Sequence, residues 1–365
     1  MSSAGRPGAG SAARLACGRT EMDADGPDNR REDPRQECFG WLACHVRGDS
    51  AGQAGPVTAR LTRRPGGPAR LRALLEAGQT IVAPGAFDPL SARLVEEAGF
   101  PAVYMTGFGT SAALIGRPDV GLLTMTEMAG NAGRIAACVD IPVIADADTG
   151  SGNPLNVIRT VGAYEAAGAA GIHIEDQVAP KKCGHLEGKL IIPAEEMAAK
   201  VRAAVEARTQ SEFVIIARTD ARAVEGLERS LQRGRMYREA GADVLFIEAL
   251  TSEAEAEEAV RAFPDVPLLF NWAEGGKTPP ISLDRLQELG YRIVIFPIST
   301  LLAATGAMRR ILQEIAGQGT PAAVLRELPA FAEFVDFIGL PEVYEAEQRY
   351  AAKDAAVAPG TAGAG

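Results

Sequence analysis

Two carboxylates, Asp146 and Asp148, follow a short apolar run and stand two residues apart. If the extended backbone continues through both, their side chains point to the same side. Such a pair suits a hard divalent cation such as magnesium, which prefers oxygen ligands and leaves positions for water and substrate. The glycine-rich run DTGSGN, which begins at Asp148, lets backbone approach a ligand. We therefore expect metal-assisted chemistry, with calcium binding or a purely structural turn as the alternatives.

A second group of reactive side chains lies in the segment PKKCGHLEGK, residues 180–189. Cys183 follows two lysines and precedes His185 by two residues, so the thiol sits in positive potential. Positive potential favours the thiolate and suits a cysteine to proton transfer or nucleophilic attack. The flanking Pro and Gly residues predict a mobile loop. An inert buried thiol is the usual alternative for a single cysteine.

Other polar residues also follow short apolar runs. They are Thr106 and Gly107, Glu175 to Gln177, Arg218 to Asp220, Glu248 and Asn271. Burying so many polar atoms for stability alone would be costly, which favours a shared functional site. The alternative is that these residues are helix caps and surface turns.

Eight apolar runs alternate with longer amphipathic stretches, which is typical of βα units around a parallel sheet. The runs are 80–83, 102–105, 142–145, 171–174, 213–217, 244–247, 267–270 and 292–296. Eight strands that are apolar on both faces predict an α/β fold, a (β/α)8 TIM-type barrel followed by C-terminal helices. A doubly wound sheet is the alternative fold. In a barrel, the polar residues above would meet at the carboxyl ends of the strands.

Helix boundaries agree with this alternation. Thr124 with Glu127 forms a capping box, and Asn153 before Pro154 forms a cap followed by a first-turn proline. Three helices are expected to end in glycine after the sequence Glu-Ala or Glu-Ala-Ala, at Gly99, Gly168 and Gly241.

The chain has 365 residues, 47% of them hydrophobic, and a net charge of -10. An acidic protein is repelled by nucleic acid and by anionic membranes, so neither is an expected partner. No run reaches the roughly 20 apolar residues of a membrane helix, and the N-terminus lacks the apolar core of a secretory signal. We therefore expect a cytoplasmic protein.

The two ends of the chain differ from the middle. Residues 1–67 lack sustained periodicity and predict a disordered leader or an over-extended translation start, and residues 351–365 predict a disordered tail. The acidic residues of the leader count against a transit peptide. The five cysteines form no disulfide or zinc pattern, and Cys38, Cys44 and His45 are interpreted as incidental. The domain between these ends spans residues 68–350.

Seven motifs occur together and in order: TGFGTSA, ADADTGSGN, HIEDQ, KKCGH, ARTDA, EGGKTP and FPIS. In this combination the chain resembles the isocitrate lyase / phosphoenolpyruvate mutase superfamily over residues 71–350. The most similar members are 2-methylisocitrate lyase, 2,3-dimethylmalate lyase and carboxyphosphonoenolpyruvate phosphonomutase, which carry the CGH loop. The resemblance implies homotetramers that exchange C-terminal helices, here residues 323–350.

The resemblance also implies roles for individual residues. Magnesium, with manganese as an alternative, would bind at Asp146 and Asp148, with Asp119, Glu175 and Glu248 around it through water. The substrate's carboxylate and oxyanion would contact Thr106, Gly107 and Arg218, and the rest of the pocket would be Tyr104, His173, Asn271 and Ser299. Cys183 would protonate an enolate, and the same closing loop carries Lys181, Gly184 and His185.

These roles predict a magnesium-dependent carbon–carbon lyase that cleaves 2-methylisocitrate or a 2,3-dialkylmalate through a pyruvate-like enolate. A phosphonomutase, an oxaloacetate hydrolase or decarboxylase, and a non-catalytic barrel are the alternatives. The chain departs from methylisocitrate lyases at TGF, residues 106–108, and at LEG, residues 186–188. Less positive charge in the loop would weaken recognition of a tricarboxylate and favours a small dicarboxylate.

Overall fold

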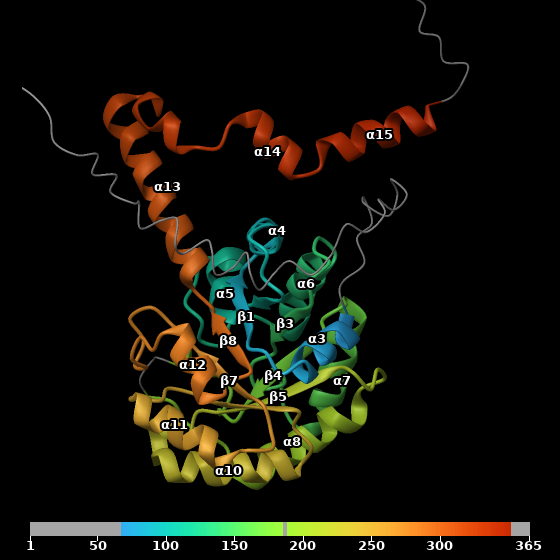
Figure 1. The fold of residues 1–365 in the computed structure, drawn as a ribbon, viewed down its shortest axis with the longest axis vertical. Coiled ribbons are helices and arrows are strands. Elements are labelled where there is room, and N and C mark those ends of the chain that lie inside the picture. The colour runs from blue at the N-terminus through green and yellow to red at the C-terminus, as the bar shows by residue number, and fades with distance from the viewer. Residues whose placement is uncertain (1–66, 185–187, 352–365) are drawn as a thin grey trace, which may run out of the picture. The chain divides into compact units, whose positions relative to one another are not determined.

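The computed structural model describes residues 67–184 and 188–351. Eight parallel strands form a closed barrel in chain order, so the predicted fold class is confirmed and the doubly wound sheet is excluded. The strands lie at the centre, with helices around them (Figure 1). They are β1 (Ile81–Ala86), β2 (Val103–Met105), β3 (Val143–Asp146), β4 (Gly171–Glu175), β5 (Val214–Thr219), β6 (Val244–Ile247), β7 (Leu268–Asn271) and β8 (Ile293–Phe296).

Helices precede the barrel, connect its strands and follow its last strand. They are α3 (Gly67–Glu76), α4 (Pro89–Glu97), α5 (Gly107–Ile115), α6 (Met125–Ala136), α7 (Pro154–Ala167), α8 (Ala194–Ala207), α9 (Arg222–Glu225), α10 (Leu227–Glu239), α11 (Glu253–Ala262), α12 (Leu283–Leu289), α13 (Ser299–Gln318), the 3-10 helix η1 (Ala322–Glu327), α14 (Phe331–Phe337) and α15 (Leu340–Tyr350). None of the helices in the described ranges has the length and apolar character needed to span a membrane.

The predicted helix signals are present. Thr124 and Glu127 form a reciprocal capping box at α6, and Asn153 caps α7 with Pro154 in the first turn. Gly99, Gly168 and Gly241 all have positive φ, between 83° and 102°, as the glycine stops require. These caps fix where each strand begins and therefore which residues reach the carboxyl end of the barrel.

The strand register pairs the polar residues across neighbouring strands. Asp146 of β3 lies beside His173 of β4, and Glu175 of β4 lies beside Arg218 of β5. Gly171 allows the close approach of β4 and β5, because a Cβ there would lie 2.7 Å from the carbonyl oxygen of Val214. The register therefore brings Asp146, Glu175 and Arg218, which are distant in the sequence, to the same end of the barrel.

The opposite end of the barrel is closed by α3. Leu71 of this helix is fully buried and belongs to the same apolar cluster as the inward-facing strand residues Ile81, Phe246 and Ile293.

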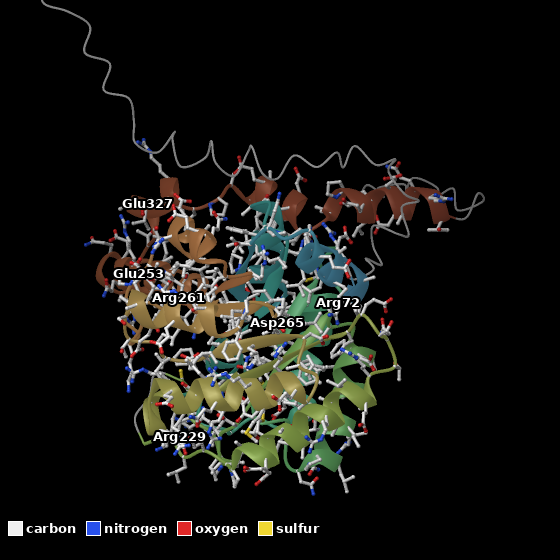
Figure 2. All side chains as sticks on the ribbon, turned by 60° about the horizontal axis from the view of Figure 1, so that its bottom comes forward. Arg72, Arg229, Glu253, Arg261, Asp265 and Glu327 are labelled. Atoms are coloured by element: carbon white, nitrogen blue, oxygen red, sulfur yellow. The ribbon has the colours of Figure 1, made fainter. Side chains whose placement is uncertain are left out.

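On the polar side of α3, the guanidinium of Arg72 donates to Asp243 at 3.0 Å. The same carboxylate accepts from Arg208 and from the backbone N–H of Ile215. Figure 2 labels Arg72 among the charged side chains of the outer surface.

The helices after β8 differ from those of the barrel, because α13, α14 and α15 bury none of their residues. Large apolar side chains in this part are exposed, including Leu312, Phe331 and Tyr350. Arg93 of α4 contacts α14, where its guanidinium donates to the carbonyl oxygen of Phe337 and lies 4.9 Å from the ring centroid. The predicted leader and tail, and the cluster Cys38, Cys44 and His45, lie outside the described residues apart from Gly67 and Ala351.

Candidate active site

Three carboxylates surround one ammonium group at the mouth of the barrel. Lys181 Nζ lies 2.6 Å from Asp119 Oδ2 and 2.8 Å from Asp148 Oδ1. Asp146, whose charge also acts on Lys181, completes the group. The expectation that the strand continues through Asp148 is wrong, because β3 ends at Asp146 and Asp148 takes a left-handed φ of 49°. The turn nevertheless keeps both carboxylates in one site, since the backbone N–H of Asp148 donates to Asp146 Oδ1.

The N-terminus of α5 faces this carboxylate group. Thr106 caps the helix by accepting from the backbone N–H of Gly109, and the backbone N–H of Gly107 donates to Asp146 Oδ2 at 3.2 Å. A helix N-terminus stabilises negative charge through its free N–H groups and its dipole. Gly107 is required for this approach, because a Cβ there would lie 2.2 Å from Asp146 Oδ2.

Arg218 forms the centre of a second buried charge cluster. Its guanidinium makes two hydrogen bonds to Asp220, at 3.0 and 3.1 Å, and lies 3.2 Å from Glu175 and 3.7 Å from Glu248. Glu248 in turn accepts from Asn271 at 3.1 Å. Burial raises the pKa of Glu175 well above its usual value, although Arg218 acts in the opposite direction. The contacts with Asp220, Glu175 and Glu248 fix the orientation of the Arg218 guanidinium, and Arg218 also lines the cavity.

Tyr104 and His173 lie under the carboxylates. The tyrosine hydroxyl is 2.8 Å from His173 Nε2, and the same nitrogen is 3.2 Å from Asp146 Oδ1. His173 is fully buried, whereas Tyr104 lines the cavity. His173 therefore lies behind Asp146 and Tyr104 and contacts both side chains through Nε2.

The segment that carries Cys183 is held against the mouth by backbone contacts. The N–H of Cys183 donates to the carbonyl oxygen of Asp119, and the N–H of Lys182 donates to the side chain of Gln177. Gly184 packs directly on the second cluster, since a Cβ there would lie 2.4 Å from Arg218 and 2.7 Å from Glu248. His185 lies outside the described residues.

A cavity of about 150 Å³ lies between the two clusters and this segment. By volume it has room for on the order of ten water-sized groups, which is the scale of a small organic acid. Its polar lining includes Thr106, Asp119, Asp146, Lys181, Cys183, Arg218 and Asn271. Ser299 stands at the first turn of α13 and contacts the cavity-lining Glu274 through a hydrogen bond.

Sequence reasoning missed the apolar side of this cavity. Phe108, Ala273, Ile295, Pro297 and Ile298 line it, together with Glu274. Five of these six residues, all except Phe108, lie at or just after the ends of β7 and β8, and this position was the available signal. Polar residues at the strand ends were predicted to form the site, whereas the apolar residues beside them were not.

The donor set fits a divalent cation. Among the described residues, the two clusters bring Asp119, Asp146, Asp148, Glu175, Asp220 and Glu248 against the three cations Lys181, Lys189 and Arg218. Burial and the neighbouring carboxylates raise the pKa of Asp148 to about 6, although Lys181 acts in the opposite direction. The described residues contain no closed cage of three or more ligating side chains. A pair of carboxylates with positions left for water and substrate is how magnesium is commonly held.

This combination defines a class of protein: a parallel barrel enzyme with an acidic, partly apolar cavity at the carboxyl ends of its strands. Residues 71–316 match the family model described as phosphoenolpyruvate phosphomutase. The chain belongs to this family, within the phosphoenolpyruvate mutase/isocitrate lyase superfamily.

The names of the chain's relatives describe several different activities. The chain is 47% identical over 283 residues to 2,3-dimethylmalate lyase of Eubacterium barkeri, a match that covers 78% of this chain and 98% of that protein. Enzymes named 2-methylisocitrate lyase and carboxyvinyl-carboxyphosphonate phosphorylmutase are also relatives. The predicted resemblance is therefore confirmed.

Solved structures agree with the fold. Oxaloacetate acetylhydrolase in complex with the inhibitor 3,3-difluorooxalacetate superposes with a TM-score of 0.75 at 39% identity, covering 80% of this chain and 99% of that chain. Phosphonopyruvate hydrolase in complex with oxalate and magnesium superposes with a TM-score of 0.71 at 35% identity, covering 78% and 98%.

The tight contact at Gly107 makes a testable prediction. Gly107→Ala should lower the free energy of unfolding by about 1–3 kcal/mol, because the added methyl group overpacks against Asp146. Magnesium binding, measured by calorimetry, should weaken in the same variant because the Asp146 carboxylate is displaced.

The control is Gly162→Ala on the exposed face of α7, where no atom lies within 4 Å of the added Cβ. That change should stabilise the protein by about 0.5–1 kcal/mol, since alanine favours helix. Urea unfolding measures both variants, and equal stability of Gly107→Ala and wild type would contradict the packing argument.

Proposed function

We propose that the protein is a magnesium-dependent carbon–carbon lyase that cleaves a small 2-hydroxydicarboxylate to a 2-oxo acid such as pyruvate. The observation that carries the proposal is the cavity in which Asp146, Arg218 and Cys183 meet. These residues offer, within one cavity, an oxygen ligand for a cation, a fixed guanidinium for a carboxylate and a thiol for proton transfer.

The chemistry assigned to the chain's own residues has three parts. The positive end of the α5 dipole and the guanidinium of Arg218 hold the carboxylate of the substrate. When the C2–C3 bond breaks, the 2-hydroxyl becomes the carbonyl of the 2-oxo acid and its proton passes to a carboxylate that lines the cavity. The electron pair of the C2–C3 bond passes to the departing acid as an enolate, which takes a proton at carbon from Cys183 Sγ. A magnesium ion held by Asp146 and Asp148 would supply positive charge to the oxygens that develop negative charge.

The apolar wall favours a substrate with alkyl groups. Phe108, Ala273, Ile295 and Ile298 line the cavity with apolar side chains. Methyl substituents gain about 0.8 kcal/mol per buried carbon in such surroundings. This supports a 2,3-dialkylmalate over the larger and more charged 2-methylisocitrate, in line with the dimethylmalate lyase of Eubacterium barkeri as a relative.

Oxaloacetate hydrolysis is the second candidate. The likeness to oxaloacetate acetylhydrolase favours it, and the same carboxylate and arginine contacts would hold oxaloacetate. A phosphonomutase remains a third activity of the same family.

A substrate panel tests the proposal. With magnesium, 2,3-dimethylmalate should yield pyruvate in a dehydrogenase-coupled assay, faster than 2-methylisocitrate or isocitrate, and a chelator should abolish the rate. Oxalate and acetate from oxaloacetate would instead establish the hydrolase. If protein that binds magnesium in calorimetry cleaves no substrate of the panel, both the lyase and the hydrolase are rejected. A phosphorus-detected assay would then test the mutase.

Cys183→Ser should lower the cleavage rate by more than about 100-fold, because serine keeps the size of the side chain but is a far weaker acid. Magnesium affinity should stay unchanged. Cys138→Ser is the matched control, since Cys138 packs behind α6 with its thiol donating to the carbonyl oxygen of Ile135. Undiminished turnover by Cys183→Ser would remove the thiol from the mechanism.

The proposal includes a homotetramer whose subunits cover each other's C-terminal helices. It is supported by the exposure of Phe331 at 82% and Leu312 at 63% on α14 and α13. Apolar side chains grouped on one terminal segment mark an interface more often than a free surface.

Phe331→Asp together with Leu312→Asp should convert the tetramer to smaller species. Light scattering coupled to size exclusion measures the change, and circular dichroism checks that the barrel stays folded. A wild-type monomer at micromolar concentration would overturn the tetramer.

A further inference from the structure

Lys189 is a buried lysine that the chemistry above does not use. Its side chain is only 2% exposed, and its ammonium lies 2.7 Å from Asp220 Oδ1. The same ammonium donates a hydrogen bond to the carbonyl oxygen of Gly184. Lys189 therefore joins the residue after Cys183 to the end of β5.

The carboxylate that receives Lys189 is itself held from several sides. Asp220 accepts two hydrogen bonds from Arg218, and its backbone N–H donates to Asp176 Oδ1 at 2.8 Å. Asp176 accepts further bonds from Thr219 and Tyr237, both at 2.7 Å. Asp220 is thus a rigid anchor, and it is shared by the arginine that lines the cavity and by Lys189.

The segment around Cys183 has one fixed point on each side of the thiol. On the N-terminal side, the backbone N–H of Cys183 donates to the carbonyl oxygen of Asp119. On the C-terminal side, the carbonyl of Gly184 meets Lys189. Gly184 is buried and packs against Arg218 and Glu248 without room for a Cβ, so a small displacement of this carbonyl would move the thiol.

A buried ammonium is costly unless its charge and its hydrogen bonds are satisfied. Arg218 already balances the charge of Asp220. Asp220 therefore does not need Lys189 as a second cation that also contacts the Cys183–Gly184 segment. The contact with Gly184 is what Lys189 adds to the site. Lys182 is a useful comparison, because it also donates to a carbonyl of this segment, that of Gly188, but at an exposed contact.

We propose that Lys189 is a positioning residue, which holds the Cys183–Gly184 segment over the cavity by linking the Gly184 carbonyl to the Asp220–Arg218 pair. Through Asp220, the placement of the thiol is coupled to the arginine that lines the cavity. The effect on turnover rests on the proposed lyase function. The effect on the thiol itself does not, and it can be measured without substrate.

The test is Lys189→Met, which keeps most of the side-chain volume and removes the ammonium. Iodoacetamide should alkylate Cys183 severalfold faster in this variant than in wild type, quantified by peptide mass spectrometry with Cys138 as the internal reference. In the panel assay, kcat should fall by about 100-fold while KM changes little, because a displaced proton donor affects the step after binding. Lys189→Arg should restore part of both properties, since arginine can still donate to two oxygens.

Lys182→Met is the matched control: it removes a positive charge beside Cys183 without releasing Gly184, so alkylation of Cys183 should not become faster than in wild type. Gly184→Ala should displace the Cys183–Gly184 segment independently of Lys189, because the added methyl group would overlap Arg218. This variant should also accelerate alkylation of Cys183. Unchanged alkylation in Lys189→Met, or a loss of thermal stability with unchanged alkylation and kcat, would overturn the proposal. Failure of both Lys189→Met and Lys189→Gln to fold would make Lys189 a stability residue and would overturn it equally.

If alkylation responds as expected but no substrate of the panel is cleaved by any form, the positioning role stands and the proposed function fails. If wild type cleaves a substrate and Lys189→Met matches it in both readouts, the function stands and the positioning role fails.

Discussion

Like-charge repulsion at the mouth of the barrel is the constraint on which the rest of the site depends. Parallel strands all end on the same side, so the carboxylates that follow them converge there whether or not they attract one another. Lys181 offsets Asp119 and Asp148 at 2.6 and 2.8 Å, and Arg218 offsets Asp220 and Glu175. The remaining negative charge is what makes the site receptive to a divalent cation and to protons.

Glycine has a specific part in this arrangement at two positions. Gly107 lets the start of α5 approach Asp146, and Gly184 lets the cysteine segment lie on Arg218 and Glu248. In each case a methyl group would occupy space that a charged side chain already fills. The two clusters can therefore stay compact, and the burial of their charged groups strengthens the interactions between them.

The proposed lyase and the proposed role of Lys189 follow from the same geometry. A proton must reach carbon at a defined place, which requires the donor thiol to be fixed relative to the substrate carboxylate. Arg218 donates to both oxygens of Asp220 and Lys189 donates to Oδ1, so one carboxylate serves both requirements. In the proposed function, Phe108 and Ile298 of the apolar wall would select among acids that share the same reacting atoms.

The eight apolar runs, the caps at Thr124 and Asn153 and the glycine stops were sufficient to predict the barrel, because periodicity and capping are local properties of the chain. Asp146, Glu175, Arg218, Glu248 and Asn271 were predictable for a related reason: they lie at or directly after strand ends, and parallel strands end together. Asp119 and Ser299 were expected only from the resemblance to the family. The left-handed turn at Asp148, the apolar wall and the buried link from Lys189 to Gly184 and Asp220 were not predictable in this way. These features depend on strand register and on side-chain packing between segments distant in the chain, which only the tertiary structure decides.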